Sequence, residues 1–306
     1  MSDKSVLVTG VGGLIGGAVA RRLTGLGRRV IGLDRTAPSG LPCAFEPHDL
    51  GDAHRLHEII LSHRIGAIVH AGGISGPMVL PANPARVAEI NIMGLVDILE
   101  AMRVHKLDRL VWFSTINVYR EGSDPAPVGE NAVRRPATVY GASKLAGEGL
   151  LAAYAAEHGV DGVALRVSST YGPGRTSPCF VRLLIEDAMA GRKTRVPEAE
   201  ARTRQHIFVD DVVDAVLLAL ERRRLPQLAY NIGPGEALTT SEVVAKVALG
   251  VPSAAIEIAT DGMPWNAFCL GPLDISAARR DLGWEPRVSL AEGARRYADW
   301  LAQRRK

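Results

Sequence analysis

The stretch Ser5-Val-Leu-Val-Thr-Gly-Val-Gly-Gly-Leu-Ile-Gly16 decides the fold. Its first five residues form a short, mostly apolar run that predicts a buried strand. Glycines then interrupt the run, and from Leu14 to Leu26 apolar residues recur at helical spacing until Gly27 ends the segment. The stretch therefore predicts a strand, a glycine-rich turn and a helix.

The residues that follow complete the pattern of a dinucleotide-binding unit. A second apolar strand, Val30 to Leu33, leads into Asp34, which lies 18 positions after Gly16 (34 − 16 = 18). Glycines let the backbone approach a pyrophosphate, the helix N-terminus attracts the anion, and a carboxylate after the second strand accepts hydrogen bonds from the ribose. Asp34 would repel a 2′-phosphate, so the sequence predicts NAD as the cofactor, although the cationic Arg35 leaves NADP open.

The same alternation continues over the first 170 residues. Short apolar runs predict strands at residues 67–70, 109–113 and 163–167. Amphipathic segments predict helices at residues 52–62, 83–105 and 140–158. This order is typical of an α/β fold, a Rossmann-type doubly wound parallel sheet with helices on both faces.

The ends of the predicted strands carry the first candidate site residues. Ligands of such sheets bind beyond the carboxyl ends of the strands. At these ends the sequence has Gly10, Asp34, His70-Ala-Gly-Gly73 and Ser114-Thr115. We expect them to line one crevice, with His70, Ala71 and Gly72 beside the cofactor.

After about residue 170 the pattern becomes less regular. Helices are expected near residues 180–190, 212–221, 241–248, 275–282 and 290–303, and a strand at 229–232. We expect residues 1–170 to form an NAD-binding Rossmann domain and residues 171–306 a smaller C-terminal α/β substrate-binding domain. The segment 208–232 is expected to return to the first domain.

A candidate proton-transfer pair lies in Tyr140-Gly-Ala-Ser-Lys144. Residues four apart lie one turn apart on the same face of a helix. A nearby ammonium stabilises a phenolate and lowers the tyrosine pKa from about 10, which lets the phenol exchange a proton with an alcohol or carbonyl. By itself the spacing is equally typical of a surface helix with an extended lysine.

Composition narrows the class of protein. The net charge of +3 is only mildly basic and argues against nucleic-acid binding. Cys43, Cys179 and Cys269 form no disulfide framework, and neither they nor the eight histidines show metal-ligand spacing. No apolar run approaches the roughly 20 residues of a membrane span, and the N-terminus has no signal-peptide core. The expectation is a cytoplasmic protein without a metal or membrane partner.

A series of further motifs extends over nearly the whole chain. They include Asp49-Leu50, Asn91-Ile-Met-Gly94, Ser114-Thr-Ile-Asn-Val-Tyr119, Tyr171-Gly-Pro-Gly174, Arg204, Val209-Asp-Asp-Val212 and Leu282-Gly-Trp-Glu-Pro286. In this order, and together with the glycine-rich turn and the Tyr140/Lys144 pair, they resemble the extended short-chain dehydrogenase/reductase family. That family includes the NAD-dependent sugar epimerases and dehydratases.

The resemblance implies a role for each matching position. The implied cofactor contacts are Gly10, Gly13, Leu14, Ile15 and Gly16 at the pyrophosphate, Asp34 at the ribose, Asp49 and Leu50 at the adenine, and Ala71 and Asn91 near the nicotinamide half. Tyr140 would be the general acid/base, and Lys144 would hold the nicotinamide ribose and lower the Tyr140 pKa. Thr115, or alternatively Ser114, would hydrogen-bond the reacting oxygen. Members are often homodimers, which implies a second copy of this chain as partner.

The implied reaction leaves several activities open. The tyrosinate takes a proton from a substrate hydroxyl while hydride leaves the same carbon for the nicotinamide. A dehydrogenase releases the ketone, whereas an epimerase returns the hydride to the other face. A dehydratase usually has Asp-Glu after the threonine, and Ile116-Asn117 argues against it. Proteins of this fold that only sense NAD(P) typically lose the tyrosine and lysine, so a non-catalytic regulator is the remaining alternative.

Three departures concern substrate recognition. Ser169 stands where nucleotide-sugar members carry an asparagine, Glu198-Ala-Glu-Ala-Arg202 replaces a glycine-rich turn, and Gly262-Met-Pro-Trp-Asn266 replaces a late Arg-Pro-Gly-Asp stretch. Trp265 could stack on a ring, although core packing explains it better. We therefore predict an NAD-dependent oxidoreductase/epimerase that acts at a hydroxyl or keto carbon of a sugar or sugar-acid-like substrate. Ser169, Arg175 and Arg204 are the candidate substrate contacts, and a nucleotide-sugar (UDP-hexose) 4-epimerase is the alternative.

Overall fold

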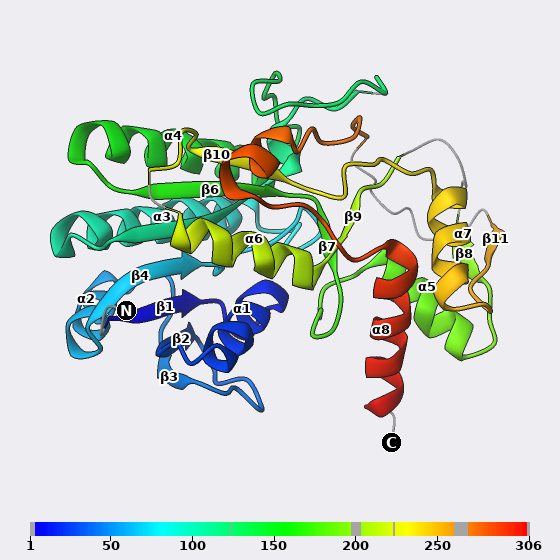
Figure 1. The fold of residues 1–306 in the computed structure, drawn as a ribbon, viewed down its shortest axis with the longest axis horizontal. Helices are drawn as coiled ribbons and strands as arrows, with labels where there is room; N and C mark the ends of the chain where they lie inside the picture. The colour runs from blue at the N-terminus through cyan, green and yellow to red at the C-terminus, as the bar shows by residue number, and fades with distance from the viewer. Residues whose placement is uncertain (1–3, 123, 197–202, 223, 260–268, 305–306) are drawn as a thin grey trace.

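The centre of the molecule is a parallel sheet. A computed structural model describes residues 4–122, 124–196, 203–222, 224–259 and 269–304. Within them, seven strands pair in the order β10-β6-β5-β4-β1-β2-β3 (Figure 1). The strands are β1 (Ser5–Thr9), β2 (Val30–Asp34), β3 (Ala44–Pro47), β4 (Ile65–His70), β5 (Arg109–Thr115), β6 (Gly162–Val167) and β10 (Ala229–Ile232). The doubly wound α/β sheet predicted from the sequence is confirmed.

Helices cover both faces of this sheet (Figure 1). On one face lie α2 (Ala53–Ser62), α3 (Pro84–His105) and α4 (Val139–His158), packed through Leu95, Ile98 and Trp112. On the other face lie α1 (Leu14–Gly25) and α6 (Val209–Glu221), packed through Val19 and Val216. The sheet is thus buried from both sides, which explains why its strands are nearly continuous apolar runs.

The strand register aligns the loops that matter for function. In β1, Thr9 pairs with Leu33 of β2 on one side and with His70 of β4 on the other. The three strands therefore end at the same level. The residues that follow them are brought to one edge of the sheet, as expected for a ligand site in this fold.

Further elements lie beyond the carboxyl ends of the strands. They are α5 (Phe180–Met189), α7 (Thr240–Gly250), α8 (Leu290–Gln303) and two small parallel pairs, β7 (Ser169–Tyr171) with β9 (His206–Phe208) and β8 (Thr194–Val196) with β11 (Ile256–Ile258). Phe180, Leu184 and Tyr297 belong to the same apolar cluster as Val8 of the central sheet. The C-terminal elements are therefore packed firmly onto the sheet.

Some element boundaries differ from the sequence-based expectation. Helix α6 begins at Val209 rather than at residue 212, because Asp210 and Asp211 are favourable in the first turn of a helix. The expected helix at 275–282 contains a π-helix, Ala278–Leu282, which ends at Gly283 with φ 72°. Strands β3, β7, β8, β9 and β11 were not predicted, since three or four residues are too few to show a periodicity.

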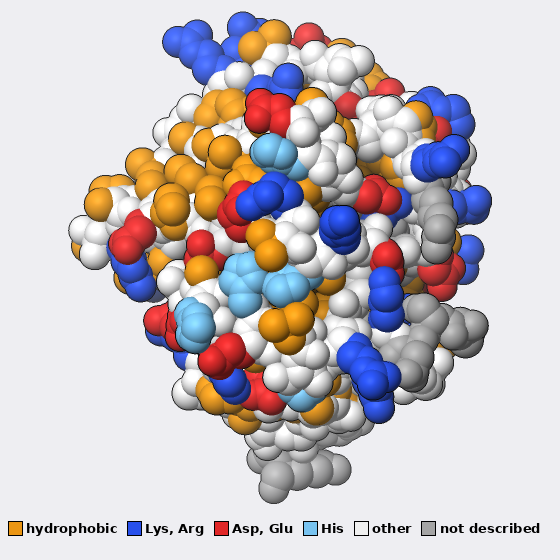
Figure 2. All heavy atoms as spheres, turned by 90° about the vertical axis from the view of Figure 1, so that its left-hand side faces the viewer, with side chains coloured by type: hydrophobic (Ala, Val, Ile, Leu, Met, Phe, Trp, Pro, Cys, Tyr) orange, Lys and Arg blue, Asp and Glu red, His pale blue; other side chains and the backbone are white. Residues whose placement is uncertain are grey.

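The surface of the helical side carries exposed apolar side chains. Figure 2 shows hydrophobic side chains gathered on the side of the molecule where the central helices end. On α3, Met93 and Val104 are 51% and 50% exposed. No helix in the described part of the chain is long and apolar enough to cross a membrane.

Candidate active site

A cavity of about 1150 Å³ lies at the carboxyl ends of β1, β2, β4 and β5. Its wall continues across α4 to residues 168–170, 175–178 and 203–206. The predicted site residues on this wall are Gly10, Gly13, Leu14, Ile15, Gly16, Asp34, Arg35, Asp49, Leu50, Ala71, Gly72, Ser114, Thr115, Tyr140, Lys144, Ser169, Arg175 and Arg204. Pockets for a drug-sized ligand measure roughly 300–1,000 Å³, so this cavity has room for a dinucleotide and a small substrate together.

The close backbone packing of the glycine-rich turn allows only glycine at Gly10 and Gly16. Gly10 has φ 71°, and a Cβ there would lie 2.7 Å from the carbonyl oxygen of Ala71. A Cβ on Gly16 would lie 2.2 Å from the carbonyl oxygen of Gly10. Helix α1 begins directly after Gly13, and no side chain caps its first turn. The exposed N–H groups and the positive end of the helix dipole fit the pyrophosphate of a dinucleotide.

Asp34 lies at the rim of this turn. Its Oδ2 accepts a hydrogen bond from the Gly12 amide at 2.9 Å and its Oδ1 from the Arg35 amide at 2.8 Å. Two backbone amides thus fix the carboxylate, which keeps lone pairs for ribose hydroxyls. A 2′-phosphate would meet this negative charge, which favours NAD.

Two predicted cofactor residues lie behind the cavity wall. His70 is buried, and its Nδ1 is 2.8 Å from Thr9 Oγ1, which in turn accepts from the Gly72 amide at 2.9 Å. Burial, followed by the charges of Lys144 and His48, lowers the pKa of His70 to about 3, so the ring is neutral. The side chain therefore fixes the loop after β4.

Asn91 supports the same loop from α3. Its amide accepts from the Ile74 N–H at 2.8 Å, donates to the Ile74 carbonyl at 3.1 Å and donates to Ser143 Oγ at 3.0 Å. Ser143 is on α4, next to Lys144. The side chain of Asn91 thus connects the cofactor loop to the helix of the proton-transfer pair.

Tyr140, Thr115 and Lys144 meet at the middle of the cavity. Helix α4 begins at Val139, with Thr138 Oγ1 accepting from the Gly141 amide at 3.0 Å, so Tyr140 lies in its first turn. The Thr115 side chain, at the end of β5, lies near enough to the Tyr140 phenol to lower its pKa. Lys144 is 6% exposed, and its Nζ lies 4.9 Å from the centre of the Trp112 ring.

The electrostatics of this pair differ from the expectation. Burial raises the pKa of Tyr140, whereas the nearby Thr115 hydroxyl and the charge of Arg175 lower it, and the net direction is upward. The net shift is upward because desolvation of the phenolate outweighs these favourable interactions. The lowering of this pKa by Lys144 remains a prediction. Burial also lowers the pKa of Lys144 to about 8.

Ser114, the alternative to Thr115, points into the protein. Its Oγ donates to Glu148 Oε1 at 2.6 Å. Glu148 is also held by Arg166, whose Nε and Nη2 donate to its two oxygens at 2.8 and 2.7 Å. Thr115 is thus the hydroxyl that reaches Tyr140.

The interactions of Glu148 and Arg166 extend into a buried network that was not predicted from the sequence. Arg166 Nη1 also donates to Tyr119 Oη at 2.8 Å, and Tyr119 Oη donates to Asn231 Oδ1 at 2.6 Å. The network therefore joins β5, α4, β6 and β10 directly behind the reacting groups. One signal was available, since Glu148 follows Lys144 by four residues and so lies on the same face of the helix.

The remaining wall carries the predicted substrate contacts. Ser169 is exposed at the start of β7. The Arg175 guanidinium donates to the backbone carbonyls of Thr170, Ser177 and Pro178. Arg204 lies 4.6 Å from the centre of the Phe180 ring. Residues 198–202 and 262–266, with Trp265, lie outside the described part of the chain.

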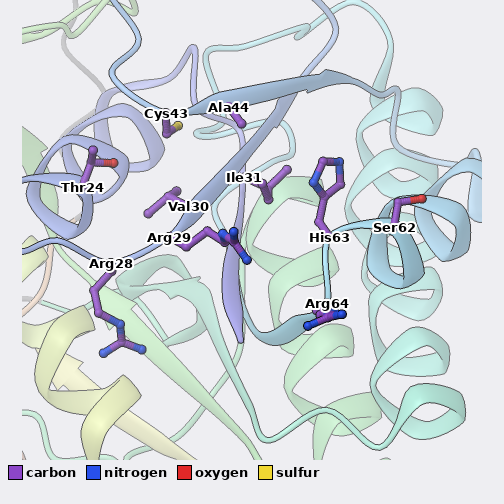
Figure 3. Close-up of a pocket in the computed structure, with 10 residues that line it drawn as sticks. All are labelled: Thr24, Arg28, Arg29, Val30, Ile31, Cys43, Ala44, Ser62, His63 and Arg64. Carbon is purple, nitrogen blue, oxygen red and sulfur yellow. The ribbon is translucent and has the colours of Figure 1, made fainter. Parts of the chain in front are cut away.

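A second cavity, of about 460 Å³, lies at the opposite ends of the strands (Figure 3). Figure 3 shows Arg29 beside Val30 and Ile31, whereas Arg28 lies farther from His63. Helices α1 and α2 end at this cavity, and cations are favourable beside helix C-termini. Because parallel sheets bind ligands at their carboxyl ends, this cavity is not the expected site of the reaction.

Other kinds of site are not found among the described residues. They contain no group of three or more histidine, cysteine, aspartate or glutamate side chains that could hold a metal ion. Cys43, Cys179 and Cys269 are free thiols.

Comparison with known proteins identifies the family. The family model described as the NAD dependent epimerase/dehydratase family matches residues 6–233. The UDP-glucose 4-epimerase of Mycolicibacterium smegmatis is 31% identical, over 96% of this chain and 97% of its own. The dTDP-6-deoxy-L-talose 4-dehydrogenase of Kitasatospora kifunensis is also 31% identical, over 97% of this chain and 95% of its own.

The fold comparison agrees. The crystal structure of the UDP-glucose 4-epimerase of Thermotoga maritima with UDP-glucose has a TM-score of 0.90 and 27% identity, and the match covers 99% of this chain and 100% of that one. The protein is an enzyme of the short-chain dehydrogenase/reductase superfamily. It belongs to the NAD-dependent epimerase/dehydratase family, and the predictions of this family and of NAD as cofactor are confirmed.

Proposed function

We propose that the enzyme oxidises, reduces or epimerises a hydroxyl or keto carbon of a sugar or sugar-acid-like substrate, with Tyr140 as the general acid/base. The observation that carries this proposal is the meeting of Tyr140, Thr115 and Lys144 on the wall of one cavity. A dinucleotide turn and a proton-transfer group share that cavity, as hydride transfer at an alcohol carbon requires.

NAD fits the first part of the cavity. The backbone of the turn from Gly10 to Gly16 would hold the pyrophosphate, and Asp34 would hold the adenosine ribose. Asp49 and Leu50 would contact the adenine. When bound, NAD supplies the hydride acceptor, and NADH supplies the donor.

The side chains then divide the work of proton transfer. In oxidation, the Tyr140 phenolate removes the proton from the substrate hydroxyl; in reduction, the phenol gives it back. The Thr115 hydroxyl donates to the reacting oxygen and fixes its position. The Lys144 ammonium, which is buried beside Tyr140 on the same helix face, would hold the nicotinamide ribose through its N–H donors.

A second candidate is a nucleotide-sugar (UDP-hexose) 4-epimerase. It is supported by the relatives with that activity and by a cavity long enough for a substrate larger than a free sugar. Against it, Ser169 replaces the asparagine expected to hold a diphosphate.

The decisive experiment supplies NAD to the purified enzyme with free sugars, sugar acids and UDP-sugars in turn. Nicotinamide absorbance reports net oxidation, and chromatography of the sugars reports epimers. Net NADH formation with a free sugar or sugar acid supports the first candidate. Formation of an isomerised UDP-sugar without net NADH would support the UDP-hexose 4-epimerase instead.

We further propose that residues 1–170, together with the returning segment 208–232, form the cofactor-binding domain, and that the rest of residues 171–306 forms the substrate-binding domain. We also propose a homodimer formed through α3 and α4, supported by the exposed Met93 and Val104 of α3. The three free thiols support a cytoplasmic location. Light scattering of the purified protein tests the dimer, and a Met93→Glu variant should shift it to monomer.

A further inference from the structure

Unpartnered polar atoms mark the far end of the active-site cavity. Ser168 Oγ and both ring nitrogens of His206 are buried, line the cavity and have no hydrogen-bond partner in the described part of the chain. The Ser169 backbone approaches the imidazole and raises its pKa, but the contact lacks the geometry of a hydrogen bond. An unpaired buried polar group costs roughly 1–3 kcal/mol, so such groups need an explanation.

By contrast, the side chain next to His206 in the sequence has hydrogen-bond partners. Gln205, one residue before His206, donates to the Gly271 carbonyl at 2.8 Å and accepts from the Leu273 amide at 3.0 Å. His206 opens β9 opposite Ser169 of β7, and its ring packs edge-on against Tyr171 with 6.2 Å between the ring centres. The backbone therefore fixes the ring in the cavity wall, with both of its nitrogens buried and without a partner.

The same end of the cavity is positively charged. Its wall at residues 168–170, 175–178 and 203–206 includes Arg175 and Arg204, and the acidic residues on the described wall, Asp34 and Asp49, lie at the cofactor end. The three backbone carbonyls fix Arg175, and Thr240 Oγ1, at 3.2 Å from Nε, fixes Arg204. Both cations are thus held in place.

The charges of the two arginines shift the pKa values of nearby titratable groups. Burial, followed by the charges of Arg204 and Arg175, lowers the pKa of His206 to about 3, so its imidazole is neutral and can donate one hydrogen bond and accept another. Arg175 also lowers the pKa of Tyr140. An anion attracted to the arginines would therefore lie near the proton-transfer group.

We propose that Ser168, His206, Arg175 and Arg204 form a carboxylate-binding subsite, and that the substrate is a hydroxy acid. The Ser168 hydroxyl and one His206 nitrogen would donate to the carboxylate, the other nitrogen would accept from a substrate hydroxyl, and the arginines would supply the charge. The proposal rests on the proposed function for the reacting hydroxyl at Tyr140. It excludes a neutral sugar as the preferred substrate.

Steady-state kinetics with NAD test the preference. The probes are aldonates of three to six carbons and hexuronates, each paired with the neutral polyol or sugar of equal carbon number, together with hexose phosphates and UDP-hexoses. We expect at least one acid to exceed its neutral partner about tenfold or more in kcat/KM, the size of one charged hydrogen bond. Preference for a neutral partner, a sugar phosphate or a UDP-hexose overturns the proposal, as does the absence of any preference.

Variants locate the preference within the structure. His206→Phe keeps an aromatic ring but removes both nitrogens, and should raise KM for the preferred acid about tenfold while kcat changes little. Ser168→Ala should raise it less, and His206→Gln, with a donor and an acceptor, should retain part of the affinity. His54→Phe on the exposed surface of α2 is the matched control. An unchanged KM in correctly folded His206→Phe contradicts the subsite.

A binding measurement separates this inference from the proposed reaction. Calorimetry of the same acids with Tyr140→Phe loaded with NAD needs no turnover. Acid binding that is lost on adding His206→Phe supports the subsite even if no acid is oxidised. Turnover of a neutral sugar that His206→Phe leaves unchanged supports the reaction and rejects the subsite.

Discussion

The two ends of the active-site cavity are built in different ways. The cofactor end uses backbone amides of one continuous turn, Gly10 to Gly16, and the Asp34 carboxylate, which the Gly12 and Arg35 amides fix. The substrate end uses side chains from separate segments, among them Ser168, Arg175 and His206. A backbone site binds what all members share, whereas side chains can be exchanged without disturbing the fold. The contrast explains why the sequence predicted the cofactor but left the identity of the substrate open.

Tyr140 lies between the two ends, and its removal gives the largest expected effect. Tyr140→Phe should lower kcat by about 10²–10⁴-fold, because the proton-transfer group is lost. NAD and substrate affinities should stay nearly unchanged, measured by calorimetry. Tyr154→Phe, on the surface of the same helix, is the control. Full activity in Tyr140→Phe would show that another group moves the proton.

The network behind Ser114 ties the two ends together. Glu148→Ala leaves the Arg166 guanidinium buried without its partner and should cost about 3–5 kcal/mol in free energy of unfolding, measured with urea. Exposed Glu157→Ala should change stability by less than about 0.5 kcal/mol. The double variant Glu148→Met/Arg166→Met should recover most of the loss. If Glu148→Ala loses less unfolding free energy than Glu157→Ala, the network does not stabilise the fold.

Lys144 contributes to function at the expense of stability. Burial lowers its pKa from 10.5 to about 8 in the folded state, so the unfolded chain binds more protons between these values and stability rises with pH there. Below pH 8 the full cost, on the order of 3 kcal/mol, is present. Lys144→Met should therefore be more stable than the wild type at pH 7 and lose this advantage towards pH 10.5.

Denaturation of both proteins at pH 7 and pH 10 measures the difference. Lys246→Met removes a surface lysine paired with Glu236 and should show no such pH-dependent gain. If Lys144→Met is less stable at both pH values, its burial is compensated by contacts such as the Trp112 ring, and the assigned cost is wrong.

The smallest expected effect comes from a substitution in the glycine-rich turn at the cofactor end of the cavity. Gly16→Ala places a Cβ against the Gly10 carbonyl and should cost about 1–3 kcal/mol in unfolding free energy while weakening NAD binding. Gly25→Ala in the same helix has open space and should gain about 0.5–1 kcal/mol. Thermal unfolding and NAD titration measure both. Equal NAD affinity in both variants would show that the turn tolerates a side chain.

A feature could be predicted from the sequence when the residues that form it lie close together along the chain. The strand, turn and helix around Gly10 could be predicted because their periodicity and glycine spacing are local. The pairing of Ser169 with His206 could not, since β7 and β9 have three residues each and lie 37 positions apart (206 − 169 = 37). The bond of Ser114 to Glu148 depends on how α4 packs on β5 and decided between Ser114 and Thr115.

The sequence by itself determined the doubly wound sheet, the dinucleotide turn and the Tyr140/Lys144 pair, because each is set by residues within about one turn or strand of one another. Only the tertiary structure decided that His70 and Asn91 lie behind the wall, that burial raises the Tyr140 pKa, and that His206 faces the cavity beside two arginines. Burial and charge depend on every segment that packs around a group, and no local pattern records them.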